Sequence, residues 1–153
     1  MSFLDKMISK KAMQQSDQLM CWKEKHDQQY PFPSDQVELT ENIPYLNDSQ
    51  PCHRMDIFRP KNHTGKLPVL FNIHGGGLLM GTKEVNRLFC AEMCQKGFLV
   101  FGLEYPLVPE KDIFSIFQDL MNGLQKAASL FDEYEGNPCH IYLTGDSAGA
   151  YLC

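Results

Sequence analysis

Residues 141–149 read Ile-Tyr-Leu-Thr-Gly-Asp-Ser-Ala-Gly, an apolar run that leads directly into the pattern Gly-x-Ser-x-Gly. The apolar run predicts a strand that is buried on both faces, as in a parallel sheet. Gly145 and Gly149 flank Ser147 and allow the tight strand-to-helix turn on which a nucleophilic serine is presented. This short motif also has accidental matches, so a glycine-rich turn that merely contains a serine is the alternative interpretation.

Two further apolar runs precede this stretch, at residues 69–73 and 98–103. Between the runs, residues 83–96 and 113–131 space their apolar side chains as helices do. Buried strands that alternate with helices predict a parallel sheet with helices on its faces. We therefore expect an α/β fold in which residues 69–73, 98–103 and 140–144 are adjacent parallel strands.

The N-terminal part of the chain has a different pattern. Residues 3–29 contain no glycine or proline and carry spaced apolar side chains, which predicts one or two helices. Residues 37–43 are expected to form an edge strand and residues 55–59 a second strand. We therefore divide the chain into two parts: a helical segment, 1–35, and the core, 36–153.

A second motif, His74-Gly75-Gly76-Gly77, follows the predicted strand at 69–73. Consecutive glycines leave backbone N–H groups free to face a ligand, and acyl transfer requires such donors because its carbonyl oxygen gains negative charge. The pattern His-Gly-Gly-Gly is the oxyanion-hole element of lipases and esterases, although a flexible glycine turn is the alternative. We expect the N–H groups of Gly75, Gly76 and Ala148 to form the hole.

With these motifs the sequence resembles the hormone-sensitive-lipase-like carboxylesterase branch of the α/β-hydrolase superfamily. A third motif adds to the resemblance: residues 105–110, Tyr-Pro-Leu-Val-Pro-Glu, are similar to the Tyr-Arg-Leu-Ala-Pro-Glu segment of that family. The resemblance covers residues from about 36 to 153. It implies the N-terminal half of an α/β-hydrolase fold, a mostly parallel sheet flanked by helices and truncated after the nucleophile turn. Residues 1–35 resemble the start of the cap of the family.

The resemblance implies that Ser147 attacks a short-chain ester by an acyl-enzyme mechanism. Gly75, Gly76 and Ala148 would form the oxyanion hole, and the supporting motif residues would be His74, Gly77, Gly145, Asp146 and Gly149. In the family the acid and the histidine follow the serine, whereas all five histidines here precede Ser147. We therefore expect a fragment that lacks both groups and is inactive as an isolated esterase.

Two other functions stay open at this point. A peptidase or amidase on the same scaffold would share the acyl-enzyme chemistry. A non-catalytic module could retain the pocket and bind a ligand or a partner. The expected partner is a small-molecule ester, and the resemblance implies neither a metal nor an organic cofactor.

Composition narrows the class of protein further. With 14 basic and 19 acidic residues the formal net charge is −5, which argues against a nucleic-acid binder. No apolar stretch approaches the roughly 20 residues that span a bilayer, so no membrane partner is expected. Without a secretory signal we expect a cytoplasmic protein with reduced thiols. Cys90 and Cys94, four residues apart, favour ordinary packing over a metal site.

The predicted strand at 141–143 also suggests how the chain associates. In the resembling fold a further strand would cover its outer side, so here it would form an exposed apolar edge. Such an edge is a template for pairing with another chain. We therefore expect self-association through this edge.

Overall fold

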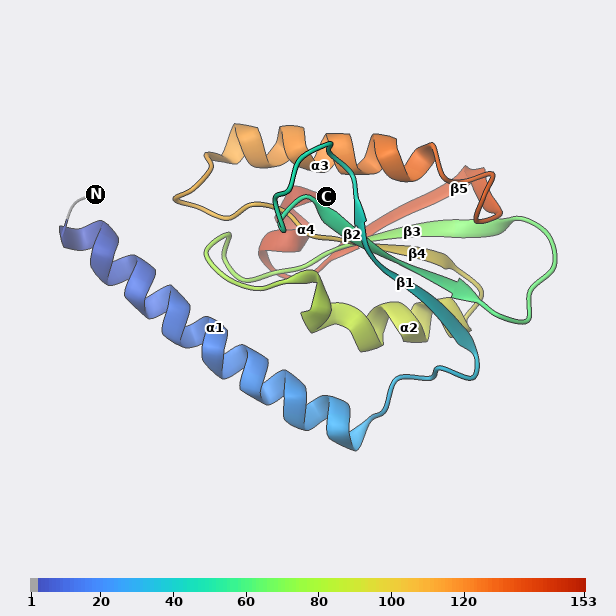
Figure 1. Cartoon of the computed structure of the whole chain (residues 1–153), viewed down its shortest axis with the longest axis horizontal. Coiled ribbons are helices and arrows are strands. Elements are labelled where there is room, and N and C mark those ends of the chain that lie inside the picture. The colour runs from blue at the N-terminus through green and yellow to red at the C-terminus, as the bar shows by residue number, and fades with distance from the viewer. Residues whose placement is uncertain (1–2) are drawn as a thin grey trace.

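A five-stranded sheet forms the centre of the molecule, for which the computed structural model describes residues 3–153. Helices and strands follow one another along the chain as shown in Figure 1. The elements are α1 (Phe3–Gln29), β1 (Val37–Pro44), β2 (Arg54–Pro60), β3 (Leu67–Ile73), the 3₁₀ helix η1 (Lys83–Asn86), α2 (Arg87–Gln95), β4 (Leu99–Leu103), α3 (Ile113–Ala128), β5 (Gly136–Gly145) and α4 (Ala148–Leu152).

The strands lie in the order β1-β2-β4-β3-β5. Strand β3 pairs in parallel with both β4 and β5, so that Phe71 lies opposite Phe101 on one side and Leu143 on the other. The expected adjacency of the three apolar runs is confirmed, and β1 is an edge strand as predicted. Because parallel strands end at the same edge of a sheet, the residues that follow β3, β4 and β5 gather there.

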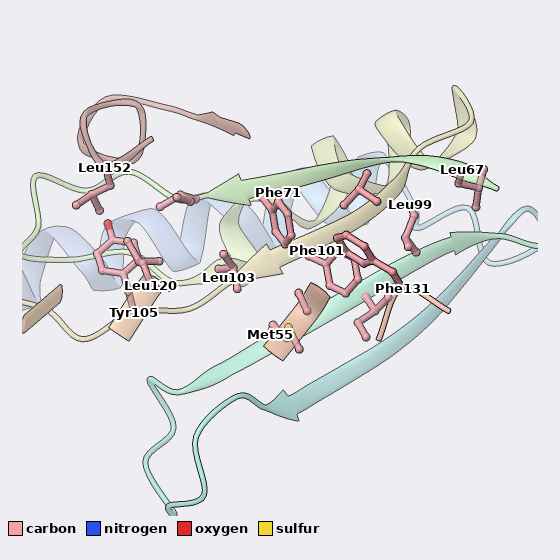
Figure 2. Packing of buried hydrophobic residues seen from close by; sticks show 14 of the residues in the cluster. Met55, Leu67, Phe71, Leu99, Phe101, Leu103, Tyr105, Leu120, Phe131 and Leu152 are labelled. Atoms are coloured by element: carbon pink, nitrogen blue, oxygen red, sulfur yellow. The ribbon is translucent and has the colours of Figure 1, made fainter. Parts of the chain in front are cut away.

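Helices cover both faces of the sheet, with α3 on one face and α2 on the other (Figure 1). On the α3 side the rings of Phe71 and Phe101 stack with centroids 5.3 Å apart. Phe131 packs against both rings, as Figure 2 shows. On the α2 side Cys90 and Cys94 are buried, and burial raises the pKa of both thiols, that of Cys94 to about 12. The two cysteines are packing residues, as expected, and all six cysteines are free.

The boundaries of three elements differ from the predictions. The helix expected at 83–96 begins as η1, because the Lys83 N–H donates to the Glu104 carboxylate at 3.0 Å and Lys83 Nζ pairs with buried Asp56 at 3.1 Å. The helix expected to reach Phe131 ends at Ala128 in a series of turns. The strand expected at 140–144 starts earlier, at Gly136, with an irregular register beside β3.

Helix α1 is a single long helix that lies apart from the layers around the sheet (Figure 1). Ala12 of this helix is buried, and the helix borders the edge where the parallel strands end. Residues 1–2 of the expected helical segment lie outside the described residues. Among the helices that are described, none combines the length and apolar character needed to cross a bilayer.

Strand β5 is the other edge of the sheet within residues 3–153. Its residues Ile141, Tyr142 and Leu143 are 44%, 49% and 43% exposed. An uncharged edge with apolar side chains favours pairing with another chain, because its backbone N–H and C=O groups can extend a sheet. We propose that the chain self-associates through β5.

A charge on the β5 edge tests this proposal. At micromolar concentration we expect the wild-type chain to sediment as an associated species and Tyr142→Lys to shift it toward the monomer, because a lysine disfavours edge pairing. Tyr30→Lys is the matched control, since Tyr30 is 53% exposed and lies just after α1. A monodisperse wild-type monomer, or equal effects of the two substitutions, would contradict a β5 interface.

Candidate active site

Ser147 lies at a sharp turn between β5 and α4. Its backbone has φ 51° and ψ −114°, a conformation that is unusual for a residue with a side chain, and the residue is exposed. A Cβ at Gly145 would lie 2.4 Å from the carbonyl carbon of Gly149. A Cβ at Gly149 would lie 2.0 Å from the carbonyl oxygen of Ile73. The two glycines therefore allow the close contact between α4 and the sheet that presents the hydroxyl.

The loop that follows β3, residues 74–81, lies beside this turn. Gly76 and Gly77 have φ values of 120° and 64°, which favour glycine. The N–H groups of Leu79 and Met80 both donate to the carbonyl oxygen of Gly76, at 3.1 and 3.2 Å, and close the loop. Within the described part of the chain the N–H groups of Gly76 and Gly77 donate to no protein acceptor. The loop therefore offers two free donors at the edge where Ser147 lies.

The N–H of Gly75, which was expected in the oxyanion hole, has a protein partner in this structure. Its N–H donates to Asp146 Oδ1 at 2.9 Å, so this donor is already occupied by a carboxylate. A Cβ at Gly75 would lie 2.2 Å from Asp146 Oδ2, which explains why a glycine stands there. Asp146, which was expected only to support the motif, thus ties the serine turn to the glycine loop.

Two asparagines extend this connection. Asn86 Nδ2 lies 2.9 Å from Asp146 Oδ1 and 3.0 Å from Asn72 Oδ1. Asp146 thus accepts hydrogen bonds from the glycine loop and from η1, and Asn86 also contacts Asn72, a residue of β3. The sequence alone did not point to either asparagine, because no motif links positions so far apart in the chain.

His74 is buried and both of its ring nitrogens have partners. Nδ1 lies 2.8 Å from the carbonyl oxygen of Gly75, and Nε2 lies 2.7 Å from Glu104 Oε1. The ring stacks on Tyr105 with centroids 4.3 Å apart, and the Tyr105 hydroxyl donates to the His74 carbonyl oxygen at 2.8 Å. Since both ring nitrogens are engaged by these partners, neither is free to take a proton from Ser147. The sequence motifs did not point to Glu104 either.

The other four histidines contact groups away from Ser147. His26 stacks on Trp22, His53 lies between Asp48 and Asp119, His63 contacts the Gly65 carbonyl oxygen, and His140 contacts Asn137. Among residues 3–153, therefore, no histidine is placed to act as a base for the serine. The same residues gather no group of three His, Cys, Asp or Glu side chains suited to a metal ion.

A cavity of about 420 Å³ opens beside Ser147. Its walls include Gly76 and Met80 from the loop and Leu19 from α1. A second cavity, of about 530 Å³, lies between α1 and residues 104–110, and Met80 contributes to its wall as well. Helix α1 thus borders both cavities.

Several known proteins are similar to this chain in sequence or in fold. The BD-FAE family model matches residues 55–153. A probable isoprenylcysteine alpha-carbonyl methylesterase of Arabidopsis thaliana is 32% identical over 114 residues, which are 71% of this chain and 24% of the relative. Esterase B of Lactobacillus rhamnosis superposes with a TM-score of 0.88 at 26% identity, over 96% of this chain and 48% of that chain. A bacterial heroin esterase superposes with a TM-score of 0.70 at 32% identity, over 80% of this chain and 39% of that chain. The chain thus spans about a quarter to a third of the curated relatives it matches and about half of esterase B.

The close contact at Gly149 gives a prediction about stability. We expect Gly149→Ala to lower the free energy of unfolding by about 3 kcal/mol or more, because the added Cβ would overlap the Ile73 carbonyl oxygen. Gly65→Ala is the control: Gly65 has φ 89° and open space around it, so only backbone strain of about 1 kcal/mol is expected. Denaturant unfolding of both variants measures the difference. Equal losses would show that α4 does not need this contact.

Proposed function

The chain belongs to the BD-FAE family, within the hormone-sensitive-lipase-like carboxylesterase branch of the α/β-hydrolases, and on this premise we propose that it carries the nucleophile and oxyanion hole of a serine esterase. The observation that carries the proposal is the left-handed backbone of Ser147 beside a loop with two unoccupied N–H donors. A strained serine next to preorganised donors is the arrangement that acyl transfer uses.

In the proposed reaction the Ser147 oxygen attacks the carbonyl carbon of a short-chain carboxylic ester. Negative charge moves to the carbonyl oxygen, where the N–H groups of Gly76, Gly77 and Ala148 stabilise it. The tetrahedral intermediate then expels the alcohol and leaves an acyl group on the serine. Water hydrolyses this acyl-enzyme and releases the carboxylic acid.

Each step needs a base that takes the proton from the attacking hydroxyl and returns it to the leaving oxygen. We propose that this base is a histidine outside residues 1–153, oriented by a carboxylate that is also outside them. The proposal is supported by the partners of His74 and by the contacts of the other four histidines, which are with residues other than Ser147. In this view the chain supplies the nucleophile and the oxyanion hole, and the base and its carboxylate come from other residues.

We also propose that residues 1–35 act as part of a cap over the core, residues 36–153. Leu19 and Gln15 on α1 line the cavity beside Ser147. The cavity is at the lower end of the size of small-molecule sites, which supports a short acyl chain. The printed names of the relatives favour an ester over an amide.

Acylation by an activated ester tests the proposed function. We expect 4-nitrophenyl butyrate to acylate Ser147 once and slowly, at a rate about 10⁴–10⁶ below that of an enzyme with its triad. Without an internal base hydroxide must remove the proton, so the rate should rise about tenfold per pH unit between pH 7 and 9, with no plateau. Mass spectrometry of the acylated peptide measures the acylation rate and its pH dependence, with Ser147→Ala as the control.

Two results would contradict this proposal. Equal labelling of the wild type and of Ser147→Ala would show that the serine is not the nucleophile. Rapid turnover with a plateau in the pH profile would show that a base lies within this chain.

A further inference from the structure

We propose that Glu104 is a positioning residue, which acts through His74 to aim the N–H of Gly76 into the oxyanion hole. The inference rests on the proposed function in so far as it names the hole as the target. It concerns a residue directly after β4, which none of the three sequence motifs includes. A chain of hydrogen bonds links the free donor to the carboxylate.

The first step is the peptide bond between Gly75 and Gly76. This group is planar and trans, so its C=O and its N–H point in opposite directions. His74 Nδ1 lies 2.8 Å from the Gly75 carbonyl oxygen and holds it on the side toward the buried imidazole. The N–H of Gly76 must therefore point away from the imidazole. A rotation of this peptide would turn the donor out of the hole and break the bond to His74.

The second step is the anchor of the imidazole itself. His74 Nε2 lies 2.7 Å from Glu104 Oε1, and the Glu104 side chain is only 12% exposed. With the Gly75 carbonyl oxygen at one nitrogen and the Glu104 carboxyl group at the other, the two contacts fix the plane of the ring. A hydrogen bond to an ionised acceptor is also shorter and stronger than one to a neutral acceptor. Glu104 thus fixes the orientation of the ring that holds the Gly75 carbonyl.

The third step is that Glu104 is itself held in place. Its Oε2 accepts the Lys83 N–H at 3.0 Å, and its Oε1 accepts the Tyr105 N–H at 3.3 Å. These bonds come from η1 and from the end of β4, on two sides of the carboxylate. The stack of the imidazole on Tyr105 removes the remaining freedom of the ring. The chain of contacts therefore runs from a rigid strand end to a donor in a glycine loop.

A second carboxylate, that of Asp146, holds the N–H of Gly75. Asp146 accepts the Gly75 N–H, while His74 holds the Gly75 carbonyl oxygen. With both of its polar groups held, Gly75 has little freedom to rotate although it is a glycine. This explains how a loop of three glycines, each of which lowers backbone order, can present a donor in one direction.

The experiment compares Glu104→Gln with Glu110→Gln, a control that removes one carboxylate from the same stretch at an exposed position. Glu104→Gln keeps the shape of the side chain but weakens the bond to His74. We expect Ser147 acylation by 4-nitrophenyl butyrate to slow about tenfold in Glu104→Gln and to stay unchanged in Glu110→Gln. We also expect faster amide hydrogen exchange in residues 74–82, and the unfolding midpoint, measured in parallel, separates this local effect from a loss of overall stability.

A spectroscopic signature and a double-mutant cycle separate positioning from mere support of the fold. In Glu104→Gln the His74 Nε2–H proton resonance should move upfield, because its acceptor loses charge. His74→Phe keeps the stack on Tyr105 but removes both nitrogens. In that background Glu104→Gln should change the acylation rate by less than about twofold, since Glu104 then has no histidine through which to act.

Each outcome decides the inference. Equal slowing by Glu104→Gln with and without His74 would overturn it, because the carboxylate would then act through Lys83 or Tyr105. Unchanged exchange in residues 74–82 would overturn it as well. If the wild-type chain shows no acylation of Ser147, the proposed function fails, while hydrogen exchange and the His74 resonance still decide whether Glu104 orders the loop.

Discussion

The close contact of α4 with the sheet is the constraint on which the rest of the site depends. At Gly149 the helix lies so near β3 that a Cβ would be 2.0 Å from the Ile73 carbonyl oxygen, and Gly145 allows the chain to turn. The turn places Ser147 at φ 51°, with its side chain beyond the end of β5. The strain at one residue is tolerated because the flanking strand and helix hold its neighbours. A looser junction would leave the serine in an ordinary conformation and away from the glycine loop.

Carboxylates give order to a loop that its composition would leave flexible. Asp146 follows β5 and Glu104 follows β4, so the parallel arrangement brings both to the end of β3, where the glycine loop begins. One accepts the Gly75 N–H and the other holds His74. Charge-assisted bonds are well suited to this task, because they are stronger than neutral ones and act at a partly shielded edge. The glycines allow the loop to adopt positive φ values, and the bonds to the two carboxylates stabilise this one conformation of the loop.

The sequence predicts the framework of this site better than its contacts. Continuous apolar runs identify the three parallel strands, because strands buried on both faces need such runs. The motifs identify Ser147 and the glycine loop, since few residues tolerate those backbone conformations. The pattern does not show that the side chain of Asp146 accepts the Gly75 N–H, a donor that was expected in the oxyanion hole. Glu104 and Asn86 went unnoticed for a related reason: their roles arise only when distant segments meet.

Acyl transfer has two requirements, and this structure bears on one of them. Stabilising the oxyanion depends on backbone donors that the contacts between β3, β4 and β5 hold in place. Proton transfer depends on a side chain that reaches Ser147, and His74, the histidine that lies near it, is committed to ordering the loop. Using His74 as the base would require its imidazole to leave Glu104, and the donor loop would lose its support. Within this chain, therefore, the same histidine cannot serve both requirements, which is the physical reason why we assign the base to residues outside it.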